Sequence, residues 1–156
     1  MNTIDTRDLQ KRMDELEELR DAIGTAQTAV DEAEEARNNL DLIADATEDQ
    51  KDASDSVVAD AQEKLEDAEA AFGKDERDEL AELEEIASEV SDFRHGETLV
   101  PVSDFTDYVR EMLHDCGDVT KHIPHYVEID WEATADNVKA DYTEVRYLWD
   151  DYLVRA

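Results

Sequence analysis

The stretch IPHYVEIDWEATADNVKADYTEVRY, residues 123–147, decides the fold predicted for this chain. Positions 126–129 are β-prone, and Asp130 follows where a helix N-cap belongs. The next residues predict a helix over 131–140, and the β-rich composition returns at 142–147. We therefore expect a strand, a helix and a strand in succession.

Large apolar side chains concentrate around this stretch. Both tryptophans and four of the five tyrosines lie within residues 126–152. Residues 145–148 and 152–155 flank Trp149-Asp150-Asp151, which predicts a closing β-hairpin. Residues 105–113 carry apolar side chains at the spacing of one helix face. The expected core residues are Phe105, Tyr108, Trp131, Tyr142 and Tyr147, and Trp149 is expected in the same aromatic cluster, as core or dimer interface.

Upstream of this part, the sequence predicts a helical arm. Two series of apolar residues each repeat at seven positions and interleave at the three and four spacing of a coiled-coil seam. A turn is expected over 45–54, with Ser54 or Asp55 capping a second helix, so that the two helices form an antiparallel hairpin; one continuous helix is the alternative. A third helix is expected over 75–93. The seam residues are Leu9, Leu16, Leu19, Ile23, Val30 and Leu40.

These patterns predict an α+β fold of two parts. Residues 1–96 form an acidic, coiled-coil-like helical region, and residues 97–156 form a small α/β module with a closing hairpin. There is no apolar run of about 18 residues, so no membrane span is predicted. The start of the chain lacks an apolar signal region and Cys116 has no second cysteine to pair with, so a cytoplasmic location is expected.

The chain is strongly acidic, with 45 acidic and 15 basic residues and a net charge of -30. Residues 1–52, 53–96 and 97–156 carry 16, 15 and 14 acids, so the charge is spread and not confined to a tail. Such a surface repels nucleic acid and anionic membranes and attracts a basic partner. The charge has three interpretations: imitation of the DNA phosphate array, solubility in a salty cytosol, or the solvated face of a coiled coil.

The region after Phe105 resembles the C-terminal part of ArdA-type antirestriction proteins, which plasmids, conjugative elements and phages carry. The matching features are DYVREMLHDCGDV at 107–119, IPHYVEIDWEATADNVKADYTEV at 123–145 and YLWDDYLVR at 147–155. The resemblance covers about residues 97–155; residues 1–93 differ, since that family carries further small α/β domains there. It implies a DNA-like acidic protein that blocks type I restriction-modification enzymes in a prokaryotic cytoplasm.

An enzyme is not predicted. His114, Cys116, His122 and His125 include an H-x-x-H, but two of these histidines flank Pro124 in an expected loop, which favours surface histidines over zinc ligands. Adjacent acids such as Asp150 and Asp151 arise by chance in so acidic a chain, and no phosphate-binding glycine motif occurs. We therefore predict no catalytic residue, metal or cofactor.

The favoured hypothesis is a non-enzymatic DNA mimic that fills the basic DNA-binding groove of a host defence complex. The alternative is a structural or scaffolding coiled coil that oligomerises through residues 9–40, which leaves a homodimer open. Under the first hypothesis the partner contacts a distributed acidic surface. Its predicted residues are Asp60, Glu63, Glu66, Asp67, Glu82, Glu85, Asp130, Glu132, Asp136 and Asp141.

Overall fold

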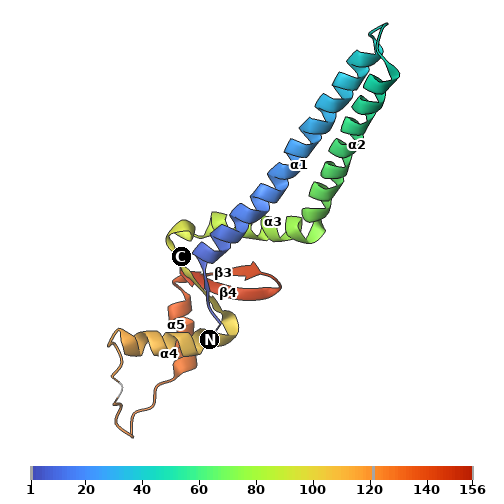
Figure 1. The fold of residues 1–156 in the computed structure, drawn as a ribbon. Coiled ribbons are helices and arrows are strands. Elements are labelled where there is room, and N and C mark those ends of the chain that lie inside the picture. The colour runs from blue at the N-terminus through green and yellow to red at the C-terminus, as the bar shows by residue number, and fades with distance from the viewer. Residues whose placement is uncertain (1, 121, 156) are drawn as a thin grey trace. The chain divides into compact units, whose positions relative to one another are not determined.

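The computed structural model describes residues 2–120 and 122–155 and has an α+β fold (Figure 1). Long helices dominate the first part of the chain, and the closing hairpin of a small antiparallel sheet lies at the end of the described residues, as the sequence predicts. The chain forms two compact units: Asp14–Leu80 is one, and Met1–Met13 with Ala81–Ala156 is the other. We call them the arm unit and the sheet unit.

The arm unit is a helical hairpin. Helix α1 (Thr6–Asp41) leads through a short turn into α2 (Glu48–Ala71), so the predicted hairpin is confirmed over the single helix. Val30 and Ala33 of α1 are buried against Ala61 of α2, with Val58 and Leu65 packed beside them. The small alanine side chains at this contact let the axes of the two helices approach closely.

The start of α2 corrects one prediction. The cap is Thr47, not Ser54 or Asp55, and the helix begins seven or eight residues earlier than those caps imply. The Thr47 hydroxyl accepts the Gln50 amide N–H at 3.3 Å, and the Gln50 side-chain oxygen accepts the Thr47 N–H at 3.0 Å. This capping box satisfies two backbone N–H donors and so fixes the start of the helix. The stretch around it is polar and has no apolar periodicity, which is why the sequence pattern did not mark this start.

The sheet unit has four antiparallel strands in the order β1-β2-β4-β3. They are β1 (Ile4–Asp5), β2 (Thr98–Pro101), β3 (Tyr142–Tyr147) and β4 (Asp150–Arg155). Helices α3 (Lys74–Glu89, which begins in the arm unit), α4 (Phe105–Asp115) and α5 (Trp131–Lys139) and the 3₁₀ helices Phe93–His95 and Val102–Asp104 complete the chain. The core cluster joins the sheet to α4 and α5 and consists of Val100, Phe105, Val109, Ala135 and Leu153.

The predicted boundary at residue 96 does not match the two units. Strand β1 pairs with β2 through Ile4 and Leu99, which places the beginning of the chain in the sheet. Thr6 is fully buried; its N–H donates to the Glu97 carbonyl at 2.9 Å and its hydroxyl accepts the Glu97 N–H at 2.8 Å. A two-residue strand has too few positions to show a period of two, so sequence patterning could not reveal it.

The central stretch is half as predicted. Helix α5 begins after Asp130, whose carboxylate accepts the Ala133 N–H at 3.0 Å, and β3 follows. The strand predicted over 126–129 is wrong: the Val127 N–H closes a turn on the Pro124 carbonyl at 2.9 Å. Tyr126 is 78% exposed. β-prone residues form a strand only where a neighbouring strand pairs with them, and residues 126–129 pair with no strand of the sheet.

Two predicted core aromatics lie elsewhere. Phe105 and Tyr147 are buried and Tyr108 and Tyr142 are packed against the core, as predicted. Trp131 is only half-buried at the edge of the unit, with its ring centroid 5.5 Å from that of His114. Trp149 is 84% exposed, so it is not a core residue. Apolar character alone does not tell a core ring from one at a helix start or a turn.

Alkaline titration should detect the packing of Tyr142. Burial of its phenol and a hydrogen bond with Tyr108 raise the pKa of Tyr142 to about 12. From pH 10 to 12 the folded chain keeps a proton that the unfolded chain loses, so this group's contribution to stability falls as pH rises through that window. Tyrosinate ultraviolet absorbance should show a late transition that Tyr142→Phe removes. Tyr142→Phe with an unchanged titration would contradict the assignment.

Candidate functional site

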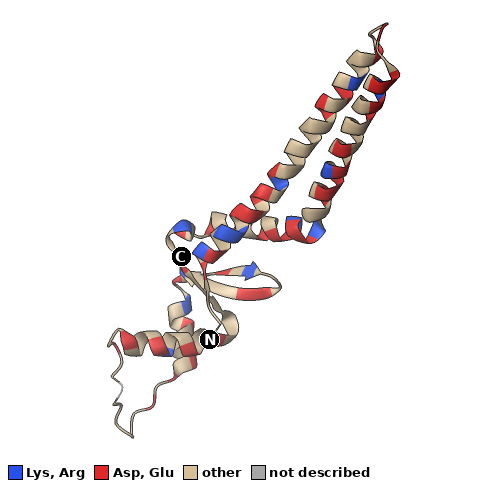
Figure 2. Cartoon of the chain, in the orientation of Figure 1, with Lys and Arg blue, Asp and Glu red and all other residues tan. Residues whose placement is uncertain are grey.

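Acidic residues recur along α2 in the arm unit (Figure 2), and their side chains are exposed. A helix turns about 100° per residue, so positions 60, 63 and 67 share one side, and position 66 borders it. That side faces away from the contact with α1: Glu63 lies about 160° around the helix from the buried Ala61, and Asp60 and Asp67 lie about 100° and about 120° from it. All four predicted carboxylates, those of Asp60, Glu63, Glu66 and Asp67, are exposed there.

The facing helix adds a second row of charge. Residues 14–41 of α1 carry ten acids and two bases, and α2 carries nine acids and two bases. The helices are joined by an ion pair between Arg37 and Asp55 and by a 3.4 Å hydrogen bond from Gln62 to Glu34. The pairing of α1 and α2 therefore nearly doubles the carboxylates per length of the arm unit.

The other six predicted carboxylates belong to the sheet unit and divide into two groups. Glu82 and Glu85 line a groove of about 310 Å³ with Glu89 and Glu144, where Ile86, Val145 and Arg146 complete the lining. Asp130 caps α5, and so has a structural role. Glu132 and Asp136 on α5 and Asp141 after it are exposed. The predicted surface is thus divided between two units.

The chain's own cations pair with only part of this charge. Lys139 lies 3.2 Å from Glu144, Arg110 lies 2.8 Å from Asp107, and Lys74 pairs with Asp78. The hydrogen bonds and charge of Arg7 hold the pKa of Asp5 at about 2. Because acids outnumber bases three to one, a large negative excess faces solvent.

The predicted seam residues are largely buried against other parts of the same chain. Leu9, Leu16 and Val30 are buried, and Leu19, Ile23 and Leu40 are half-buried. Val30 packs with Ala61 of the same chain, so this part of the seam already has its partner helix. A second chain has no free apolar stripe to bind at that point.

The histidines and the cysteine considered as metal ligands are separated. The His114 ring nitrogen lies 3.1 Å from the Val119 carbonyl, the His125 ring lies against Tyr126, and Cys116 is exposed. In residues 2–120 and 122–155, no group of three or more His, Cys, Asp and Glu side chains is placed to hold a metal ion. Across the same described residues, no helix is long and apolar enough to cross a bilayer.

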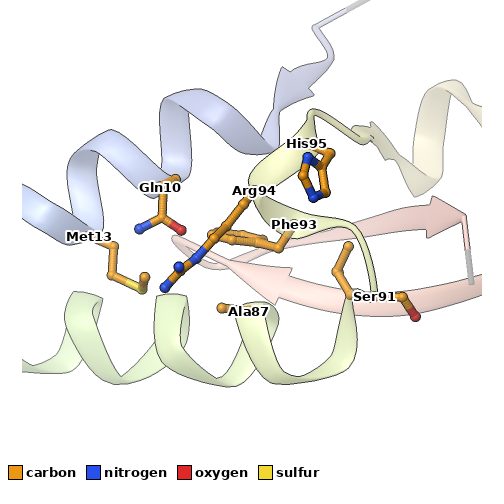
Figure 3. A pocket seen from close by; sticks show the side chains of 8 residues that line it. Gln10, Met13, Ala87, Ser91, Phe93, Arg94 and His95 are labelled. Carbon is orange, nitrogen blue, oxygen red and sulfur yellow. The ribbon is translucent and has the colours of Figure 1, made fainter.

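A small pocket of about 260 Å³ lies elsewhere in the sheet unit (Figure 3). It is lined by residues of α1, α3, the 3₁₀ helix Phe93–His95 and the segment before that helix, including Met13, Val90 and Phe93. Figure 3 shows the Arg94 side chain extending past the Phe93 ring toward Met13, so a cation lies across the pocket. This lining carries no carboxylate or thiol and does not add to the acidic surface.

One exposed feature was missed by the sequence reasoning. The turn between β3 and β4 consists of Leu148 and Trp149, which are 50% and 84% exposed. Both have positive φ, 47° and 74°. The predicted strands left three residues, 149–151, between them, so the two-residue turn and its positive φ values became visible only in the structure, where β3 ends at Tyr147 and β4 begins at Asp150.

The resemblance to ArdA-type proteins stays a prediction that rests on the quoted residues alone. Neither a protein-family model, nor a curated protein, nor a solved structure matches this chain.

Proposed function

We propose that this chain is a non-enzymatic inhibitor that occupies the basic DNA-binding groove of a host defence complex, of the type I restriction-modification kind. The observation that carries the proposal is the charge density of the arm unit. Over about 40 Å of paired helix, at 1.5 Å per residue, residues 14–41 and α2 carry 19 carboxylates and four cations, which is about one net negative charge per 2.7 Å. Duplex DNA carries about one charge per 1.7 Å.

The mechanism is competitive binding by many weak contacts. Exposed carboxylates on α1 and α2 face Lys and Arg side chains that otherwise hold phosphates, and each exposed pair contributes about 0.2–1 kcal/mol. Association releases counterions from both surfaces, so the affinity falls as salt rises. No step requires bond chemistry, a metal or a cofactor.

The scaffold alternative has less support. It needs an apolar stripe free for a second chain, whereas Val30 and Ala33 are covered by α2 of the same chain. A homodimer through residues 9–40 would therefore have to open the hairpin at this contact. The carboxylate face of α2, in contrast, is exposed without any rearrangement.

Competition with DNA tests the proposal. The chain should displace a fluorescently labelled duplex, bearing the recognition sequence, from a purified type I restriction-modification enzyme, as measured by anisotropy at low and at moderate salt. Displacement should weaken as salt rises, because both ligands use the same cations. Polyglutamate of equal net charge is the control and should displace less, since it lacks the paired-helix spacing. If the enzyme holds DNA and the chain together with neither affinity changed, groove mimicry is wrong.

A further inference from the structure

The turn at Leu148 and Trp149 is unusual in its residues. A two-residue hairpin turn with φ positive at both positions normally takes Asn-Gly or a similar pair, which reach that backbone at least cost. Here two bulky apolar residues hold φ values of 47° and 74°. Bulky residues in this region are rare outliers, and such outliers concentrate at functional sites.

Packing does not explain these residues. The turn's neighbours Tyr147 and Tyr152 are buried at 7% and 6% exposure, while Trp149 is 84% exposed. The indole therefore adds almost nothing to the core of the sheet unit. An exposed tryptophan in a hairpin turn is instead typical of a residue that becomes buried against a partner, where Trp is among the residues that dominate binding energy.

The surroundings of the turn are acidic. Asp150 and Asp151 follow Trp149 directly, and the Glu82 carboxylate accepts the Leu148 N–H at 3.0 Å. Glu82 also lines the acidic groove of about 310 Å³ with Glu89 and Glu144. Two cations lie close by and are paired: Arg146 is 3.9 Å from Asp151, and Lys139 is 3.2 Å from Glu144. The exposed indole thus lies in a region of net negative charge.

We propose that Trp149 is an aromatic anchor that stacks on an arginine side chain of a basic protein partner. A guanidinium is planar, stacks on indole faces and pairs with carboxylates, so it fits both the ring and the acids beside it. A second copy of the chain would bring its own charge of -30 against this region, which disfavours it as occupant. The inference rests on the proposed function in one respect, namely that the partner is basic.

The test compares arginine with lysine on the full chain. Decaarginine and decalysine are titrated separately into wild type, Trp149→Ala and the double variant Leu148→Asn/Trp149→Gly, with calorimetry at two salt concentrations. Both peptides carry the same charge, so the ratio of their affinities reports contacts beyond charge. Loss of the indole should lower the arginine-to-lysine ratio about two- to fivefold while binding of decalysine stays unchanged.

Three controls make each outcome decisive. Leu148→Asn alone keeps the indole and should keep the ratio, and so should Tyr126→Ala, which removes another exposed aromatic ring. The double variant should melt at or above the wild-type temperature, since Asn-Gly suits the turn, so its loss of preference is not a loss of fold. An unchanged ratio in Trp149→Ala overturns the anchor.

The occupant is tested separately from the proposed function. If sedimentation shows a wild-type dimer that becomes monomeric in Trp149→Ala, the turn binds a second copy and the arginine assignment is overturned. The arginine-to-lysine ratio can fall as expected while DNA and the chain bind the restriction enzyme at the same time. In that case Trp149 still binds arginine, on another basic partner, and only the proposal of groove mimicry is wrong.

Discussion

Truncation of Phe105 to alanine is expected to unfold the sheet unit at ordinary temperatures. Phe105 is 4% exposed and contacts the core cluster of Val100, Val109, Ala135 and Leu153. Its ring also lies 4.9 Å from that of Tyr142, edge to face. Removing a buried Phe costs about 3–5 kcal/mol, which is most of the stability of a small domain. Urea denaturation followed by near-ultraviolet circular dichroism should show the loss.

The matched control is Trp131→Ala. This larger ring is half-buried and lies beside His114 at the edge of the unit, so its truncation should cost about 1 kcal/mol, well below the cost at Phe105. The sequence analysis places both rings in the core, and a buried Trp131 would cost about 3–5 kcal/mol to truncate, as Phe105 does. Equal losses in the two variants would show that Trp131 belongs to the core after all.

The parts of the fold that the sequence predicted are those with strong local signals. Asp130 caps α5 and apolar spacing marks α4, and both helices are where they were expected. The closing hairpin follows from two β-rich runs around a short gap. The heptad repeat predicted a helix that pairs along Val30, and α2 provides the pairing. Each of these features depends only on residues within a few helical turns or one hairpin, so the local sequence is enough to predict it.

The parts that it could not predict depend on contacts distant in sequence. The two residues of β1 become a strand only because β2, more than ninety positions later, supplies hydrogen bonds. Tyr126 and Val127 have strand composition but no neighbouring strand. The exposed position of Trp149 follows from the hairpin geometry, not from its hydrophobicity. Of the candidate site, the exposure of the α2 acids was predictable from helix period, whereas the groove at Glu82 needed the fold.

Neutralising the acidic face of α2 is expected to weaken binding to the proposed partner by a large factor. The quadruple variant Asp60→Asn/Glu63→Gln/Glu66→Gln/Asp67→Asn removes four exposed charges on one face while keeping the shape of every side chain. At about 0.2–1 kcal/mol for each lost contact, the affinity for the restriction enzyme should fall about 4- to 900-fold. The dependence of affinity on salt should flatten in step, because fewer counterions are released.

Single changes should behave differently from the set. Glu63→Gln alone removes one solvated charge and should change the affinity by less than about fivefold, since one exposed pair contributes less than 1 kcal/mol. None of these variants should lower the melting temperature, because the four side chains face away from the contact with α1 and their removal relieves repulsion. Anisotropy titrations across a salt series, with melting curves for every variant, measure both quantities.

The decisive comparison uses the same change in net charge at another place. Glu128→Gln/Glu132→Gln/Asp136→Asn/Asp141→Asn removes four exposed carboxylates from the sheet unit and leaves the α2 face intact. If α2 is the contact face, this variant should bind far more tightly than the α2 variant, although the two chains have equal charge. Equal losses would mean that affinity follows net charge without a defined face. No loss in either variant would remove the basis of the mimicry proposal, because the carboxylates would then be a solvated surface only.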